Sequence, residues 1–574
     1  MPQPTLVRKV GRAETPDWKV PMMVRRVGYY DRLVSHVRRE NASESTHVLG
    51  RYDPTRLVMS LDERLANAMS MNAPVGGDVW VDSERMSDLD VAAMGTYCHE
   101  LVHWWQYLGT TAGFALGLAT ANKGLAGLDK LNKISRASTL WKPLIQQRDD
   151  NYRGVTRSSD RDLLTYLLND WSDLYFATML VLHPSESDGI RRSAHFVSPG
   201  HSIFMLLSVV NELLRATLMS DCSDFPDANT WWDDYKSAVG RFRDFDEDAT
   251  MRMPALGGTE ILEGQARMSE CQYLAQDGED FDSLRRRGLM GAVYTRALEM
   301  FIKLTGAQTP STPLSPVIDM FLLVCDIACN PSVGYPLDIG DCDRLCRDFM
   351  MGWRFLAACD WLRKHKSAIN AVKRSDRNEY VQLSGDLCHG CSWEPPHALF
   401  ERIRRYHVAV EGHPRLRIEH GGADVVDFSL VGLLTSRHFS LVTDKLSTPE
   451  VFVWPGRYLI FRRGDHRVAE VVRLREKHVP INFSKGLNAR AQYIAPLDMP
   501  VQHRGKVMAA YMEHYLVSDL FEQLVENYGE FAPDYVWFDP NGDRRDYQDL
   551  CDEMIRTHFG RGVSDFRVYE MPRS

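Results

Sequence analysis

The sequence predicts an α+β protein that is predominantly helical, contains a small sheet, and continues into a C-terminal α+β domain. Three observations predict this class. The chain has 574 residues, of which 44% are hydrophobic, so it can bury the cores of more than one domain of roughly 100–200 residues. Between about residues 160 and 375, apolar residues recur at helical spacing. After a turn-rich stretch at 375–400, short apolar runs resemble strands.

Composition argues against several classes of protein. The formal net charge of −9 argues against a chain-wide surface for nucleic acid. Eleven cysteines are few for this length and odd in number, which does not predict a disulfide scaffold and favours a cytoplasmic location. The first residues lack the apolar run of a signal peptide, and no stretch of about 18 uncharged apolar residues predicts a membrane span. The oligomeric state is left open.

A strand and a helix are predicted before residue 110. The alternating residues 78–82 (DVWVD) predict a short strand. A helix is expected over 89–108, because Ser87 or Asp88 can accept hydrogen bonds from its first backbone N–H groups. Gly109 is a natural end for this helix.

The rest of the chain divides into a helical and a strand-like part. Helices are predicted at 160–182, 201–219, 260–275, 289–304, 316–329 and 343–364. Strands are then predicted at 424–434, 451–454, 457–461 and 468–474, with a hairpin at Gly456, before a last helix at 506–528. We therefore expect an N-terminal segment (1–70), a domain with a long helical insertion (71–380) and a C-terminal α+β accessory domain (395–574).

The strongest chemical signal is the sequence HELVH at residues 99–103. His99 and His103 are one helical turn apart, so both imidazoles can face one metal ion. Glu100 follows the first histidine, where a carboxylate can act as general base toward a water at that metal. The flanking residues between 96 and 105 are uncharged, which suits a helix buried around its metal.

This segment resembles the active-site helix of the zincin metallopeptidases, whose HExxH sequence lies in a similar uncharged frame. In that family a short strand that binds the substrate backbone precedes the helix, and residues 78–82 lie in the matching place. The resemblance is local to the motif. It implies a zincin-like catalytic domain over 71–380, one Zn²⁺ per chain, and hydrolysis of a peptide or protein substrate.

A catalytic zinc usually has three protein ligands and a water, so a third ligand is expected. The third histidine of the metzincins is absent, because Gly109 stands in its place and Gln106 replaces the glycine of that motif. This departure favours a glutamate from a later helix, as in the glutamate zincins.

Residues 262–266 (LEGQA) resemble the segment that supplies this glutamate in thermolysin-related aminopeptidases. The resemblance implies that Glu263 is the third ligand, and Glu270 follows at the spacing of a second glutamate in that family. The small residue Gly264 would let this helix pack closely against the HELVH helix. The alternatives for the third ligand are Glu260 and Glu212.

The resemblance also implies a donor for the negative charge that develops on the substrate. In the aminopeptidase-like zincins, a tyrosine on a helix after the glutamate ligand has this role. Tyr294 is placed accordingly in this sequence. The alternatives are Tyr273, His195 and His201.

Cys388 and Cys391 have zinc-knuckle spacing, but a structural zinc needs four ligands and the chain has no second CxxC, so buried thiols are expected.

The favoured prediction is a zinc-dependent metallopeptidase with Glu100 as base. The alternatives are a catalytically inactive zincin scaffold or binding module, and a metal-dependent hydrolase of a non-peptide amide or ester. The cleavage specificity is left open.

Overall fold

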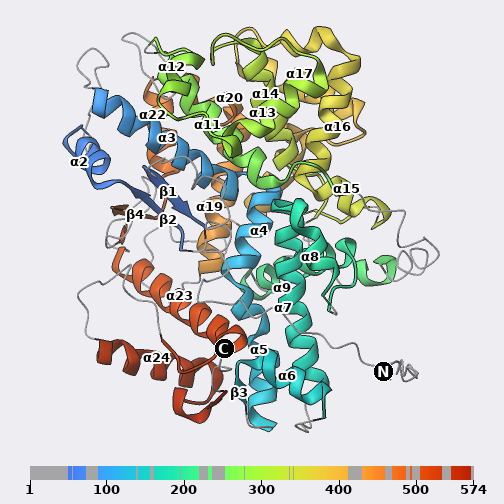
Figure 1. Cartoon of the computed structure of the whole chain (residues 1–574), viewed down its shortest axis with the longest axis vertical. Helices are drawn as coiled ribbons and strands as arrows, with labels where there is room; N and C mark the ends of the chain where they lie inside the picture. The colour runs from blue at the N-terminus through green and yellow to red at the C-terminus, as the bar shows by residue number, and fades with distance from the viewer. Residues whose placement is uncertain are drawn as a thin grey trace. The chain divides into compact units, whose positions relative to one another are not determined.

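The computed structural model describes most of the chain between residues 49 and 569 (Figure 1). The segments outside the description are 1–48, 55, 73–87, 138–139, 155–160, 194, 219–229, 236–252, 277, 335–336, 341, 411–429, 459–467, 487–490, 494–503, 533–543 and 570–574. Residues 44–574 form one compact unit. The strand predicted at 78–82 lies outside the described residues.

Two small sheets join distant parts of the sequence. The larger has the order β1-β2-β4-β5 and consists of β1 (Gly50–Asp53), β2 (Val58–Leu61), β4 (Asn482–Lys485) and β5 (Ala491–Tyr493). Strands β2 and β4 are parallel, and the two outer pairs are antiparallel. The smaller sheet pairs β3 (Trp141–Lys142) in parallel with β6 (Arg567–Val568). The predominantly helical class with a small sheet agrees with the prediction.

Helix α3 (Asp88–Gly109) contains HELVH and agrees with the helix predicted at 89–108. The preceding α2 (Glu63–Asn72) packs against it. The apolar stretch that follows forms two helices, α4 (Thr111–Ala121) and α5 (Lys123–Ala137). Within the described part of the chain, no helix has both the length and the apolar character that crossing a membrane requires.

The helices predicted in the central part of the chain are present. They are α7 (Arg161–Leu182), α9 (Pro199–Leu218), α11 (Gly258–Ala275), α13 (Ala292–Thr305) and α14 (Pro316–Cys329). The helix predicted at 343–364 is divided into α15 (Leu345–Phe349) and α16 (Met351–Lys364), because Met350 between them has an extended backbone.

Further short elements connect these helices. The additional helices are α6 (Leu144–Tyr152), α8 (Ser187–Arg191), α12 (Phe281–Arg286), α17 (Arg377–Gly390) and α18 (Pro396–Val410). Single 3₁₀ turns are η2 (Pro184–Glu186), η3 (Cys342–Arg344), η4 (Lys366–Asn370) and η7 (Val563–Asp565).

The strands predicted after residue 424 are wrong wherever the structure describes them. Their positions are occupied by α19 (Leu430–Ser447), α20 (Pro449–Val453), α21 (Pro455–Tyr458) and α22 (Val468–Lys477). A short buried apolar run looks the same in a helix and in a strand. In α22 the buried residues Val471 and Leu474 are three positions apart, which is helical spacing. The last predicted helix is present as α23 (Arg504–Glu526) and is followed by α24 (Arg544–Phe559).

Residues 395–574, expected as an accessory domain, pack within the same compact unit as α3 and α11. Helix α19 lies against α3, and α21 lies against α11. A hydrophobic core joins α5 and α7 to α23 and α24, with Leu167 and Phe521 among its buried residues. The break expected between 380 and 395 is therefore not a break in packing, because the central helices cover the apolar faces of the C-terminal ones.

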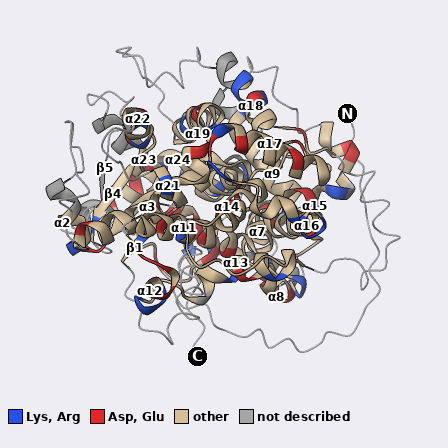
Figure 2. Ribbon diagram, turned by 90° about the horizontal axis from the view of Figure 1, so that it is seen from above, with Lys and Arg blue, Asp and Glu red and all other residues tan. Residues whose placement is uncertain are grey.

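Exposed charges pair within single helices. In α12, Arg285 contacts Asp282 at 2.9 Å, and in α16, Arg363 contacts Asp360 at 2.7 Å. Figure 2 shows basic and acidic residues together on many described helices. Exposed pairs of this kind contribute little to stability.

Gly456 tests the packing of the C-terminal region on α11. A Cβ atom at this position would lie 2.0 Å from the backbone oxygen of Ser269. We expect Gly456→Ala to lower the free energy of unfolding by about 1–3 kcal/mol, because the α11 backbone cannot move aside without repacking. The control is Gly385→Ala in α17, where the nearest heavy atom to a Cβ is His397 Cε1 at 3.9 Å. Urea unfolding measures both variants, and equal stabilities would contradict this packing.

Candidate metal centre

His99 and His103 lie on the face of α3 that packs against α11, and Glu100 is buried next to His99 on the same helix. His99, Glu100 and His103 are 5%, 5% and 8% exposed. Among the described elements, α3 and α11 make the most extensive contact. They approach at Gly95, where a Cβ would lie 3.3 Å from Leu274. Gly264, which we expected to allow this approach, instead faces α13.

Three potential ligand atoms meet between α3 and α11. The Nε2 atoms of His99 and His103 are 3.1 Å apart, and Oε2 of Glu263 lies 3.4 Å from each of them. In the described part of the chain, these side chains form the one group of three or more His, Cys, Asp or Glu that could hold a metal ion. The structure thus brings together the three predicted ligands from two helices that are far apart in sequence.

The three distances fit a tetrahedral zinc site. Atoms that lie about 2.0–2.1 Å from a zinc ion at the corners of a tetrahedron are about 3.3–3.4 Å apart. The observed separations of 3.1, 3.4 and 3.4 Å match three such corners. The Glu263 side chain keeps 22% of its surface exposed, compared with 6% for His99, so solvent reaches this group from the side of Glu263.

Gln106 determines which nitrogen of His103 carries the proton. Its side-chain amide donates to the backbone oxygen of Leu262 and to Oε1 of Gln265, each at 2.9 Å. Its own Oε1 therefore faces Nδ1 of His103, at 2.8 Å, and can only accept. Nδ1 of His103 must carry a proton, which leaves Nε2 available as a metal ligand.

Glu270 lies beside the other histidine, His99. Its Oε2 lies 3.3 Å from Nδ1 of His99, on the far side of the ring from Glu263. The contact is an ion pair without hydrogen-bond geometry, so it places a negative charge beside Nδ1 while Nε2 faces Glu263. Arg267 forms an ion pair with the same oxygen of Glu270. Each of the two histidines thus has a partner at Nδ1 and its Nε2 near Glu263, which is the arrangement that a metal ligand requires.

The charges around the site favour a cation. Burial and Arg267 lower the pKa of His99, but Glu263 and Glu270 raise it more strongly, to about 9. Burial raises the pKa of Glu263, but the two histidines lower this pKa by a larger amount. The net effect places it well below its usual range. The field that favours a proton on a histidine also favours a metal ion, so the two compete for the same lone pair.

Tyr294, from α13, lies beside His99. The two rings meet edge to face, with centroids 5.7 Å apart and planes at 81°. The guanidinium of Arg267 lies 4.1 Å from the centroid of the Tyr294 ring. Burial, with the nearby charge of Glu263, raises the pKa of Tyr294 to about 12. The phenol therefore keeps its proton at neutral pH and can donate a hydrogen bond.

The other glutamates considered as ligands have different surroundings. Glu260 accepts a hydrogen bond from the N–H of Gly257 at 2.9 Å and pairs with Arg296 at 3.1 Å. It therefore caps the start of α11. Glu212 is exposed on α9.

The alternative donors are placed as follows. His201 contacts Asp173 at 3.3 Å and the Tyr235 hydroxyl at 3.0 Å, so both of its ring nitrogens have partners within this cluster. Tyr273 is buried within α11, and His195 precedes α9.

The cysteines considered for a structural zinc lie at the end of α17. Burial raises the pKa of Cys388 to about 12 and that of Cys391 to about 11. Neither belongs to the group of potential metal ligands found in the described residues.

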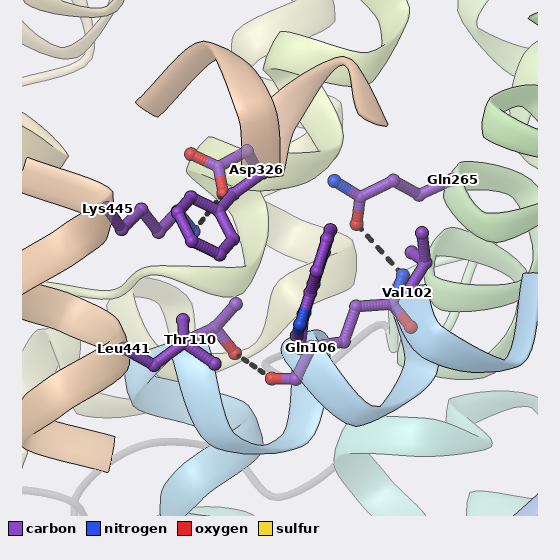
Figure 3. Close-up of a pocket in the computed structure, with 9 residues that line it drawn as sticks. Val102, Gln106, Thr110, Gln265, Asp326, Leu441 and Lys445 are labelled. Carbon is purple, nitrogen blue, oxygen red and sulfur yellow. Dashed lines mark hydrogen bonds and ion pairs between the residues drawn. The ribbon is translucent and has the colours of Figure 1, made fainter. Parts of the chain in front are cut away.

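A small cavity lies beside Gln106, among α3, α11, α14, α19 and α20, and both polar and apolar side chains line it. Figure 3 shows Gln265 bonded to Gln106 on one side of it and the ion pair of Lys445 and Asp326 on the other. The ion pair is 2.5 Å long, and both side chains are at most 4% exposed. The partner of His103 is thus held within a buried polar network.

No protein-family model matches this chain, and no curated protein or solved structure matches it either. Its function must therefore be inferred from the site itself.

The ligand assignment predicts different effects for two glutamates on α11. Glu263→Ala should lower zinc affinity by at least about 100-fold, because it removes one of the three ligands. Loss of a residue that only supports a ligand lowers metal affinity by about 10–100-fold. Glu260→Ala should leave zinc affinity unchanged, since Glu260 caps the helix. Competition with a chromophoric chelator measures both affinities. A reversed order, or equal affinities, would move the ligand role away from Glu263.

Proposed function

We propose that this chain is a zinc metallopeptidase of the glutamate-zincin type. His99, His103 and Glu263 would hold the metal, and Glu100 would act as general base on a peptide or protein substrate. The observation that carries the proposal is the group of three ligand atoms at tetrahedral spacing, with a buried glutamate beside one of them on the same helix.

The residues around the site have complementary roles. A bound Zn²⁺ would supply a Lewis acid and lower the pKa of a water molecule. Glu100 takes a proton from the attacking water and returns it to the leaving amine. Burial raises the pKa of Glu100, which brings its proton affinity closer to that of a group working near neutral pH. Tyr294 donates a hydrogen bond to the oxygen that becomes negative during attack.

Strand β1 restricts the position of Glu100. A Cβ atom on Gly50 would lie 2.8 Å from Oε1 of Glu100 and 2.7 Å from Cγ2 of Thr96. The backbone of the strand therefore passes directly beside the carboxylate. Only a glycine leaves room for Glu100 in this arrangement, so the base is oriented by a residue that takes no part in the chemistry.

The buried base favours an enzyme over an inactive zincin scaffold, since a binding module does not need Glu100. Hydrolysis of a non-peptide amide or ester would use the same residues. A panel of peptide and non-peptide substrates is therefore part of the test.

Glu100→Gln should retain one zinc per chain and lose hydrolysis by at least about 10²-fold, because the amide cannot accept the proton. Zinc content and peptide cleavage are measured together, with Glu212→Gln on α9 as the control that keeps activity. Removal of zinc by a chelator should abolish cleavage, and added zinc should restore it. A Glu100→Gln chain as active as the wild type would overturn the mechanism.

Gly50→Ala should reduce kcat by about 10-fold or more, because small displacements of a catalytic group have large effects on rate. Zinc content should stay the same, since Gly50 contacts the base and not the ligands. Gly189→Ala is the control, because nothing in the described residues lies within 4 Å of a Cβ there. Unchanged kcat in Gly50→Ala would show that β1 does not orient Glu100.

A further inference from the structure

Arg267 lies on α11 one helical turn after Glu263 and is 9% exposed. The proposed chemistry gives it no role, yet it contacts two groups that flank the metal position. We propose that Arg267 is a positioning residue that holds both Glu270, the partner of His99, and Tyr294, the donor to the substrate oxygen. This inference rests on the proposed function.

The first contact sets the carboxylate behind His99. Nη1 of Arg267 pairs with Oε2 of Glu270, and this same oxygen lies 3.3 Å from Nδ1 of His99. The Glu270 side chain is only 4% exposed. An unpaired carboxylate buried to this degree is strongly unfavourable. Without Arg267, Glu270 would have to turn away or take up a proton, and in either case His99 would lose the negative charge that lies 3.3 Å from its Nδ1.

The second contact sets the phenol. The guanidinium of Arg267 lies over one face of the Tyr294 ring, 4.1 Å from its centroid, while the His99 ring meets Tyr294 edge to face. The tyrosine ring is thus held between a cation on α11 and a metal ligand on α3. A planar guanidinium can stack on an aromatic face, which an ammonium group does less well.

The two contacts make Arg267 a shared support. Glu263, Arg267 and Glu270 lie at spacings of four and three residues along α11, so all three side chains share one face of the helix. On that face, Glu263 is aimed at the metal position directly. Arg267 acts through its neighbours, and it couples the geometry of a ligand to that of the oxyanion donor.

Arg296 provides a matched control. It also joins α13 to α11, through its contact of 3.1 Å with Glu260, but its side chain is 47% exposed and its partner caps the helix. The loss of a charged contact between α11 and α13 would be expected for Arg296→Ala as well as for Arg267→Ala. An effect through the metal site is expected for Arg267→Ala alone.

The test measures zinc affinity, kcat and KM of the full chain. Arg267→Ala should bind zinc 10–100-fold more weakly and should lower kcat at saturating zinc with little change in KM. Arg267→Lys should restore most of the zinc affinity, because the charge beside Glu270 returns, but not kcat, because the stacking on Tyr294 does not. In a Glu270→Ala background, Arg267→Ala should change zinc affinity much less than in the wild type. In a Tyr294→Phe background it should change kcat much less.

Wild-type zinc affinity in Arg267→Ala, or additive effects in both backgrounds, would overturn the proposal. If Arg267→Ala does not fold, the contrast between zinc affinity and kcat in Arg267→Lys decides it. A wild-type chain that binds zinc but cleaves no peptide would overturn only the proposed peptidase, and the zinc affinities would still decide the role of Arg267. A wild-type chain that binds no zinc would overturn both.

Discussion

The contact between α3 and α11 at Gln106 is the interaction on which the site depends. The Gln106 amide donates to the Leu262 backbone and to Gln265 at 2.9 Å, so it fixes the two helices relative to each other next to Glu263. The same amide accepts from His103 at 2.8 Å. One side chain therefore sets the distance between the helices and the protonation of a ligand. A neutral amide can do both because its NH₂ group donates two hydrogen bonds while its carbonyl oxygen accepts others.

The C-terminal region supports this helix pair. The end of α3 leaves backbone carbonyls without partners inside the helix. His438 donates to the carbonyl of Leu108 at 2.6 Å, and Lys445 donates to that of Gly109 at 3.3 Å. Both come from α19, and a positive charge at a helix C-terminus is favourable. Trp105 in turn donates to the backbone of His478, at 3.0 Å, after α22. These contacts connect the C-terminal helices to the end of α3.

The charges at the centre are arranged in two layers. The inner layer contains two histidines and Glu263, and the outer layer contains Gln106 at one histidine and Glu270 at the other. Arg267 forms an ion pair with Glu270, which offsets part of the negative charge of the outer layer. Glu100 remains as a further buried carboxylate whose pKa is raised by burial. The arrangement suits a dication with one anionic ligand and a separate base.

The sequence by itself determined the parts that depend on neighbouring residues. The spacing of His99 and His103, the extent of α3, and the central helices all follow from local periodicity and capping. The resemblance of residues 262–266 to the aminopeptidase segment indicated Glu263 as a candidate ligand. Only the structure distinguished it from Glu260, because Glu263 lies beside the two histidines whereas Glu260 caps α11. The tertiary structure alone decided that the C-terminal apolar runs are helices, because a short buried apolar run looks the same in a helix and in a strand. It also decided the contacts of Gln106 and Arg267, since a polar side chain acquires such partners only when helices far apart in sequence are packed together.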